Sequence, residues 1–286
     1  MRSANVRKAV FAGSWYPSSA AECEREIAGF LAEGEKLNPP GRELVGGIVP
    51  HAGWYFSGSI ACNVIRCLKG KDTTDVVVIF GMHLHAGSPC YMMAEGAWET
   101  PFGEIPVEET LANEIAQKFS LTLETPKRFT QDNTVELQLP FIKYFFKDAK
   151  IVAIGVPPHK NSLEIGRTVV EISKRLGLRV KVIGSTDLTH YGANYGFVSK
   201  GSGEQAVDWV RNENDRRVID AMLALEPEKI ITEARSSQNA CCAGAAATAI
   251  ETAKYLGADR ADELAYTTSY DKSPGDSFVG YAGIVF

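Results

Sequence analysis

Four short segments of this chain each end on residues that bind metal ions. They place His51 after Ile48-Val49-Pro50, His83 and His85 after Ile79-Phe80-Gly81-Met82, Asp187 and His190 after Val182-Ile183-Gly184, and Cys241-Cys242 after Asn239-Ala240. The chain has five histidines, and four of them lie in the first three segments. Ligands of open α/β sheets bind beyond the carboxyl ends of the strands. We therefore expect these side chains to meet in one pocket that holds a metal ion.

The donor types favour a transition metal. A cysteine thiolate beside two imidazoles suits iron, copper or zinc better than magnesium or calcium. Cys241 or Cys242 would supply the thiolate, and a position just before a helix amino terminus lowers the pKa of a thiol. Either cysteine could instead be a small buried hydrophobic residue. His51 alone could equally be a histidine bonded to a loop carbonyl, but beside the other segments the ligand role is favoured.

His83 and His85 are two residues apart and would point the same way on an extended chain. One metal ligand and one residue that supports it or contacts a substrate is the more usual arrangement. Asp187 and His190 are three apart, a spacing that brings side chains together on a helical turn. Asp187 would then orient His190, or both would act on a substrate as an acid/base pair. In the alternative, Asp187 caps a helix that begins after the strand.

Two weaker signals concern loops. Asp132 resembles a helix cap, with Glu136 in the first turn of that helix. The segment Ser273-Pro274-Gly275-Asp276-Ser277 is rich in turn residues and could close over the pocket, although such segments are more often simple turns. His159 follows two prolines and is expected on a surface loop.

The elements that would position these residues alternate between strands and helices. Strands are expected at 44–49, 76–80, 150–156, 179–183, 263–269 and 277–286. Helices are expected at 20–36, 57–68, 107–119, 135–146, 163–176, 204–225 and 243–256, with a short helix from Pro227. Residues 87–103 could form a hairpin at a sheet edge. The alternation predicts an α/β fold with a mostly parallel sheet, in one domain that spans residues 1–286.

The composition excludes several classes of protein. A hydrophobic content of 45% and a charged content of 23% are ordinary for a globular chain of 286 residues. The net charge of −5 gives no basic surface for nucleic acid. No segment approaches the roughly 20 apolar residues of a membrane span, and the amino terminus lacks the apolar region of a signal peptide. Six irregularly spaced cysteines predict free thiols and a cytoplasmic location.

Several motifs, in order along nearly the whole chain, resemble the Memo family, known in bacteria and archaea as AmmeMemoRadiSam system protein B. They are the segments at 12–17, 50–53, 132–140, 185–192, 240–244 and 277–283. The resemblance implies a three-layer α/β/α fold similar to that of class III extradiol ring-cleavage dioxygenases. It also implies a metal pocket of two histidines and one cysteine, flanked by an aspartate and a further histidine.

Carried onto this chain, the resemblance makes His51 the first ligand. Alignment on the downstream Cys90 selects His83 rather than His85 as the second. The family pattern has cysteine followed by glycine and a second glycine two residues later, so Gly244 selects Cys241 as the third ligand. Cys242 then stands where glycine is usual.

Asp187 and His190 match the flanking pair of the family pocket. Many relatives carry a histidine where this chain has Asn133. An asparagine cannot exchange protons as histidine can, although it can still hydrogen-bond a substrate or an oxygen species. Asn133, Glu136, His85 and Cys242 are expected to contact the substrate or support the ligands.

These residues favour a non-haem iron enzyme of the dioxygenase type, with Fe(II) as the expected ion and copper or zinc as alternatives. His190, assisted by Asp187, would be the base. A cysteine in place of the usual carboxylate changes the redox behaviour of the iron and is itself oxidisable. The alternative is a metal-binding or adaptor protein without turnover. The pocket would take a small molecule or a peptide, and the resemblance implies radical S-adenosylmethionine and AMMECR-like partners.

Overall fold

Four parallel strands form the centre of the main sheet. The computed structural model describes residues 5–286. In spatial order they are β2 (Gly46–Val49), β9 (Val180–Ser185), β3 (Val76–Gly81) and β8 (Lys150–Gly155). All six residues of β3 are buried. A continuous run of β-branched residues is typical of a parallel strand that helices cover on both faces.

Antiparallel pairings extend this centre on both sides. Next to β2 lies β12 (Phe278–Val285), which also pairs with β11 (Asp262–Thr268) and β10 (His190–Tyr191). Next to β8 lies β4 (Cys90–Met93), followed by β7 (Leu121–Glu124), which is parallel to β4. The sheet of nine strands is therefore parallel in the middle and mixed at its flanks, and the expected α/β class is confirmed.

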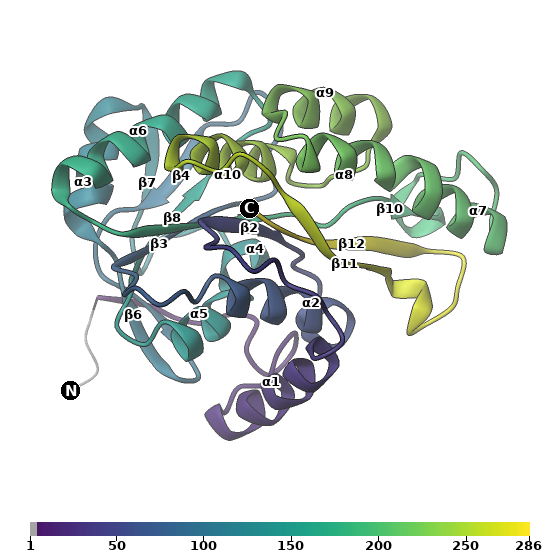
Figure 1. The fold of residues 1–286 in the computed structure, drawn as a ribbon, viewed down its shortest axis with the longest axis horizontal. Helices are drawn as coiled ribbons and strands as arrows, with labels where there is room; N and C mark the ends of the chain where they lie inside the picture. The colour runs from purple at the N-terminus through teal and green to yellow at the C-terminus, as the bar shows by residue number, and fades with distance from the viewer. Residues whose placement is uncertain (1–4) are drawn as a thin grey trace.

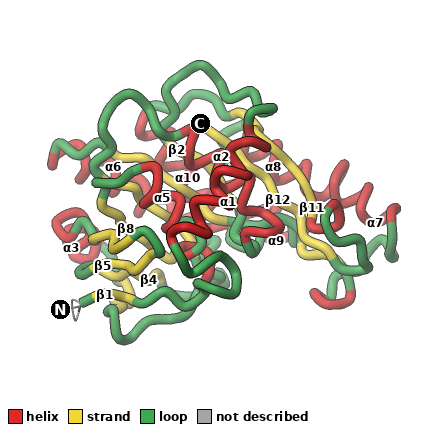
Figure 2. Tube along the Cα trace, turned by 90° about the horizontal axis from the view of Figure 1, so that it is seen from below, coloured by secondary structure: helices red, strands yellow, loops and turns green. Residues whose placement is uncertain are grey.

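Helices cover both faces of the sheet (Figure 1). One face carries α1 (Ala20–Gly34), α2 (Trp54–Cys67), α4 (Asn133–Glu136) and α5 (Leu139–Phe145). The other carries α3 (Glu109–Lys118), α6 (Lys160–Leu176), α8 (Asp215–Leu223), α9 (Pro227–Ser237) and α10 (Ala243–Leu256). Figure 2 shows the same arrangement from below, with helices in red and strands in yellow. No helix within residues 5–286 combines the length and apolar character that crossing a bilayer requires.

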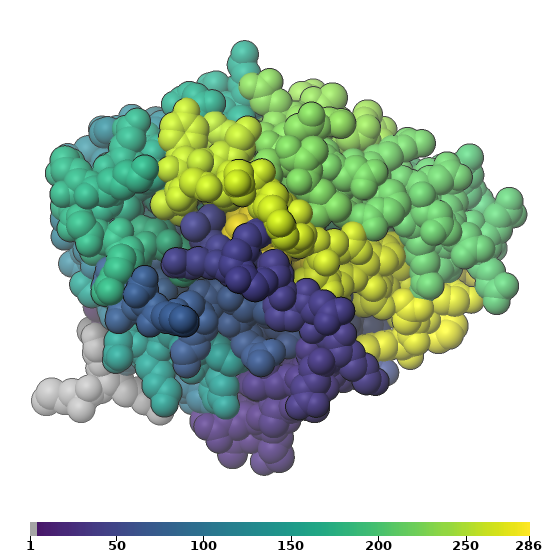
Figure 3. Space-filling model, viewed as in Figure 1, coloured from purple at the N-terminus to yellow at the C-terminus, as the bar shows by residue number. Residues whose placement is uncertain are grey.

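The small residues of α10 allow it to pack closely on the parallel strands. A Cβ atom added to Gly184 of β9 would lie 2.8 Å from the Cβ of Ala249. On the visible surface, the segment between α1 and β2 lies beside the C-terminal part of the chain (Figure 3), where Arg42 pairs with Asp262 at 2.5 Å. Segments far apart in the sequence therefore lie side by side.

Several expected elements differ in detail. The helix expected at 135–146 is two helices, α4 and α5, because Pro140 in the first turn of α5 cannot donate a backbone hydrogen bond. The helix expected at 204–225 is α7 (Glu204–Trp209), a π-helical segment (Val210–Asn214) and α8. The hairpin consists of β5 (Ala97–Thr100) and β6 (Gly103–Pro106), which form a separate sheet with β1 (Val6–Arg7).

Candidate metal centre

The strand order brings the metal-binding segments to one edge of the sheet. β2, β9 and β3 are parallel neighbours, so the residues that follow them lie side by side. His51, Asp187 and His83 follow these three strands. Cys241 and Cys242 directly precede α10, which packs across the same strands. The residues that follow strands 46–49, 76–81 and 180–185 therefore lie close together in space.

Four side chains form what we call the donor cluster: His51, His83, Cys241 and Cys242. One ligand atom from each lies within 4.8 Å of the ligand atoms of all the others. The Sγ atom of Cys241 is 3.3 Å from Nε2 of His51 and 3.7 Å from Sγ of Cys242. The two imidazole rings have centroids 4.9 Å apart. The chain therefore contains a compact group of two imidazoles and two thiols.

Ser185 fixes which nitrogen of His51 faces the cluster. The Ser185 hydroxyl donates a hydrogen bond to the carbonyl oxygen of Thr134 at 2.7 Å, so its oxygen can only accept from Nδ1 of His51 at 3.0 Å. The proton of the neutral imidazole therefore lies on Nδ1, and Nε2 presents its lone pair to the cluster. Hydrogen bonds of this kind orient metal-binding histidines. His51 is also buried, with 2% of its surface exposed.

Asp132 plays the corresponding role for His83. Its carboxylate accepts hydrogen bonds from Nδ1 and from the backbone nitrogen of His83, at 3.0 and 3.1 Å. Burial lowers the pKa of His83, but Asp132 and Cys241 outweigh it and raise this pKa to about 10. Burial raises the pKa of Asp132, but the hydrogen bonds from His83 and Thr134 lower it to about 2. Nε2 of His83 is again the nitrogen left for a ligand.

The backbone separates His83 from His85. Met82 has a positive φ of 72°, in the left-handed region, and its backbone nitrogen donates to Thr134 Oγ1 at 2.7 Å. The chain thus turns at the end of β3 instead of continuing as an extended strand. His83 lies in the donor cluster, while His85 lies on an exposed turn where its backbone nitrogen donates to Ser88.

The two cysteines differ in protonation. Burial would raise the pKa of Cys241, but its hydrogen bond with Cys242 and the imidazoles of His51 and His83 lower this pKa well below the ordinary value. Burial and the neighbouring Cys241 raise the pKa of Cys242. Backbone bonds hold the pair in place, because Cys241 N donates to the carbonyl oxygen of Asp187 at 3.1 Å and Cys242 N to Thr186 Oγ1 at 3.0 Å.

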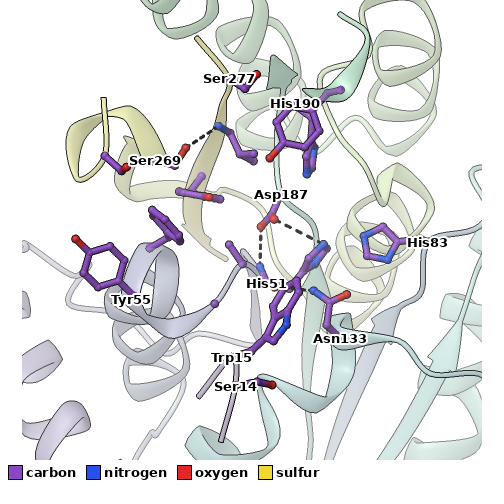
Figure 4. A pocket seen from close by; sticks show the side chains of 17 residues that line it. Ser14, Trp15, His51, Tyr55, His83, Asn133, Asp187, His190, Ser269 and Ser277 are labelled. Atoms are coloured by element: carbon purple, nitrogen blue, oxygen red, sulfur yellow. Dashed lines mark hydrogen bonds and ion pairs between the residues drawn. The ribbon is translucent and has the colours of Figure 1, made fainter. Parts of the chain in front are cut away.

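The expectation of a helical turn over Asp187–His190 is wrong. Residues 186–189 are irregular, and His190 begins β10, where it pairs with Val279 of β12. The carboxylate of Asp187 instead accepts from the backbone nitrogen of His51 at 2.7 Å, and its second oxygen lies 3.9 Å from Nε2 of His51 (Figure 4). Burial raises the pKa of Asp187.

A cavity of about 600 Å³ opens beside the cluster, and Figure 4 shows its walls. His51, His83, Asn133, Asp187 and His190 all face it. Aromatic and hydroxyl side chains form most of the remaining lining, together with Ala52, Gly53 and Val279: Ser14, Trp15, Tyr55, Phe56, Tyr195, Ser269, Ser273, Ser277 and Tyr281. The turn-rich segment at 273–277 thus contributes to the wall of the pocket.

Three other predicted residues have clear places. Asn133 lines the cavity and donates from Nδ2 to the carbonyl oxygen of His51 at 2.8 Å. Glu136 lies outside the lining and accepts from the backbone nitrogens of Val10 and Phe11 at 2.8 and 2.7 Å. It anchors the segment that carries Ser14 and Trp15. His159 caps α6, where its Nδ1 accepts from Asn161 N at 3.2 Å.

The sequence reasoning missed Ser185 and treated Asp132 only as a cap. Ser185 is the last residue of β9, so the strand-end argument that selected Asp187 applies to it as well. Asp132 does cap α4, where it accepts from Thr134 N at 2.9 Å, but its second oxygen serves His83. The pairing of Asp132 with His83 joins residues 49 positions apart, which local spacing does not reveal.

Comparison with known proteins agrees with this arrangement. The model of the Memo-like protein family matches residues 7–285. The chain belongs to the Memo family. A MEMO1 family protein of Pyrococcus furiosus is 35% identical over 98% of both chains. Another, of Methanopyrus kandleri, is 31% identical over 98% of both chains.

A solved structure shares the fold of this Memo family chain. It is that of an uncharacterized protein of Escherichia coli K12, with a TM-score of 0.52 and 11% sequence identity. The similarity covers 85% of this chain and 100% of the other. At this identity the likeness concerns the fold alone.

Proposed function

We propose that this Memo family chain is a metal-dependent oxidoreductase of the dioxygenase type that acts on a small molecule in the 600 Å³ cavity. One observation carries the proposal: two imidazoles held through Nδ1 and a cysteine with a lowered pKa converge beside an open pocket. A cluster with a purely structural role would more often be closed off from solvent.

The donor set fits a transition metal. His51, His83 and Cys241 would hold Fe(II) or copper, since imidazole and thiolate are the ligands these metals favour, and zinc is the alternative. The bound ion would supply redox chemistry and polarise a coordinated oxygen atom of the substrate. Ser185 and Asp132 would keep each imidazole in the tautomer that this binding requires.

His190 is placed to move a proton. Its Nδ1 lies 3.2 Å from the carbonyl oxygen of Leu188, which can only accept, so Nδ1 carries the proton and Nε2 is the basic atom. His190 lines the cavity beside Tyr195, with ring centroids 5.0 Å apart. The buried carboxyl group of Asp187 also lines the cavity. We propose His190 as the base that takes a proton from the substrate.

The lining favours a planar ligand of low charge. Among the described residues that line the cavity there is no lysine or arginine to pair with phosphate. Trp15, Tyr55 and Tyr195 are 41%, 65% and 48% exposed at the pocket and offer flat apolar surfaces. These exposed rings also favour the second candidate, a metal-binding or adaptor protein that takes a peptide without turnover. Radical S-adenosylmethionine and AMMECR-like proteins, in the cytoplasm, remain the proposed partners.

The test begins with metal content. Anaerobically purified wild type is compared with His51→Ala and Cys241→Ser by elemental mass spectrometry, with His85→Ala as the matched control. We expect near-stoichiometric iron or copper in the wild type and the control, and loss in the other two. Oxygen uptake with a panel of aromatic substrates should then stop in His190→Ala while its metal stays. Wild type that takes up no metal would contradict the proposal, and metal without turnover would favour the binding protein.

A further inference from the structure

We propose that Cys242 supplies a fourth protein donor, so that the ion sits in a tetrahedral site of two imidazoles and two thiolates. The inference rests on the proposed metal site and adds to the three ligands named there. It concerns the resting coordination of the ion and the identity of the metal that the chain prefers.

The distances within the donor cluster carry the argument. A tetrahedral ion bound at about 2.3 Å to sulfur and about 2.0–2.1 Å to nitrogen places two sulfurs about 3.8 Å apart and a sulfur and a nitrogen about 3.6 Å apart. The Sγ atoms of Cys241 and Cys242 are 3.7 Å apart, and Cys241 Sγ is 3.3 Å from His51 Nε2. The remaining pairs lie within 4.8 Å. The two measured pairs thus have nearly tetrahedral spacing, and the other four pairs are close enough to share one ion.

The backbone explains how two adjacent cysteines can face one point. Successive side chains of an extended strand point to opposite sides. Here the chain bends at Cys242, with φ −124° and ψ 53°, immediately before α10 begins. Thr186 holds the bend because its hydroxyl oxygen accepts from Cys242 N at 3.0 Å. Cys242 is only 3% exposed, so its sulfur turns inward to the cluster and not to solvent.

A second thiolate changes the metal preference. Four protein donors in a tetrahedral arrangement with two sulfurs suit zinc or Cu(I), whereas iron oxygenases keep open positions on a set rich in harder donors. Closed four-donor sites leave no position for a substrate. A ligand in the cavity would therefore bind the ion either by adding a fifth donor or by displacing Cys242. This makes Cys242 the residue that controls access to the metal.

Cobalt(II) reports the number of thiolates directly, because each cobalt–sulfur bond adds to the charge-transfer absorption in the near ultraviolet. We would load the full chain with Co(II) alone and compare wild type, Cys242→Ser and Cys242→Ala, with Cys67→Ser as the matched control. Wild type and the control should show tetrahedral d–d bands and about twice the charge-transfer intensity of the two Cys242 variants. Zinc affinity, measured by chelator competition, should fall in both variants, because each loses a zinc–sulfur bond.

The outcomes separate this inference from the proposed function. Equal charge-transfer intensity in wild type and in folded Cys242 variants, judged by circular dichroism, would overturn the fourth donor and leave the three-ligand site intact. If one Cys242 variant does not fold, the charge-transfer intensity of the other variant is compared with that of the wild type. Wild type that binds neither Co(II) nor zinc would overturn the proposed metal site itself, and this inference with it.

Discussion

Two buried polar groups lie close together in this molecule and differ in how their hydrogen bonds are used. In what we call the Asp215 cluster, the Asp215 carboxylate accepts from Thr189 N, Thr189 Oγ1 and Tyr266 OH, at 3.0, 2.5 and 2.8 Å. Asn214 donates to Thr189 Oγ1 at 3.0 Å. Every contact here joins protein groups to each other, which ties the start of β10 to α8 and β11.

The donor cluster, by contrast, turns four atoms that can bind a metal toward one another. His51 and His83 use Nδ1 for hydrogen bonds within the protein and turn Nε2 toward the two sulfurs and the cavity. Both clusters contain buried groups with strongly shifted pKa values, so neither property distinguishes a site from a structural group. The difference that matters is whether atoms that can bind a metal converge next to a cavity.

The largest effect on stability should come from removing the carboxylate of the Asp215 cluster. Asp215→Ala would leave the three groups that donate to this carboxylate without a partner, at about 1–3 kcal/mol each. We expect a loss of roughly 3–5 kcal/mol in the free energy of unfolding, measured by urea denaturation of metal-free protein. The exposed Asp259→Ala is the control. A loss below 1 kcal/mol would show that Asp215 is not a structural group.

The protonation of Asp215 should give the next largest effect, which is a change of stability with pH. Burial raises its pKa from 3.8 to about 6, so the folded state binds this proton more tightly than the unfolded state does. The contribution to stability is complete below about pH 4 and is lost as pH rises through 6, a change of about 3 kcal/mol. Asp215→Asn removes this titration. Relative to the wild type, this variant should gain stability between pH 4 and pH 7, and parallel pH profiles would contradict the assignment.

Metal removal should act on the donor cluster and leave the Asp215 cluster unaffected. At a free metal concentration about 100 times the dissociation constant, binding stabilises the fold by about 2.7 kcal/mol. Chelation should therefore lower the melting temperature of the wild type by several degrees and leave that of Cys241→Ser unchanged. An equal shift in both proteins would place the bound ion elsewhere.

Weakening the residues that orient the imidazoles should have a smaller effect. Asp132→Asn and Ser185→Ala keep all four donors but alter the hydrogen bonds to Nδ1 of His83 and His51. Such changes reduce metal affinity about 10–100-fold. Competition with a coloured chelator would measure the affinity of each variant. Affinities within two-fold of the wild type would mean that the cavity and backbone alone orient the rings.

The smallest effect should be at His85. This residue lies on the exposed turn beyond the cluster, and surface substitutions of this kind usually change stability by less than about 0.5 kcal/mol. His85→Ala should therefore bind metal as the wild type does in the same competition assay. A clear loss of affinity would show that the turn at Met82 rearranges to bring His85 into the site.

The sequence predicted well which residues meet at one edge of the sheet, because the residues that follow parallel strands lie on the same side. That argument selects His51, Asp187 and the pair His83 and His85, and the family resemblance then selects His83. It could not predict the bend at Met82 or the irregular segment before His190, since both depend on contacts with residues distant in the chain. The aromatic part of the cavity wall was also missed, because Trp15 depends on the anchor at Glu136 and Tyr281 on the pairing of β12 with β11.

The position of β2 between β9 and β12 has a consequence for folding during synthesis. The strand that carries His51 pairs with residues 182–185 on one side and 284–285 on the other. Nascent chains are made from the amino terminus, and pairings between distant segments form slowly. Residues 46–49 therefore cannot form these strand pairings until their partners have been synthesised. A metal ion that met the chain during synthesis would encounter His51 and His83 before Cys241 and Cys242 had been made.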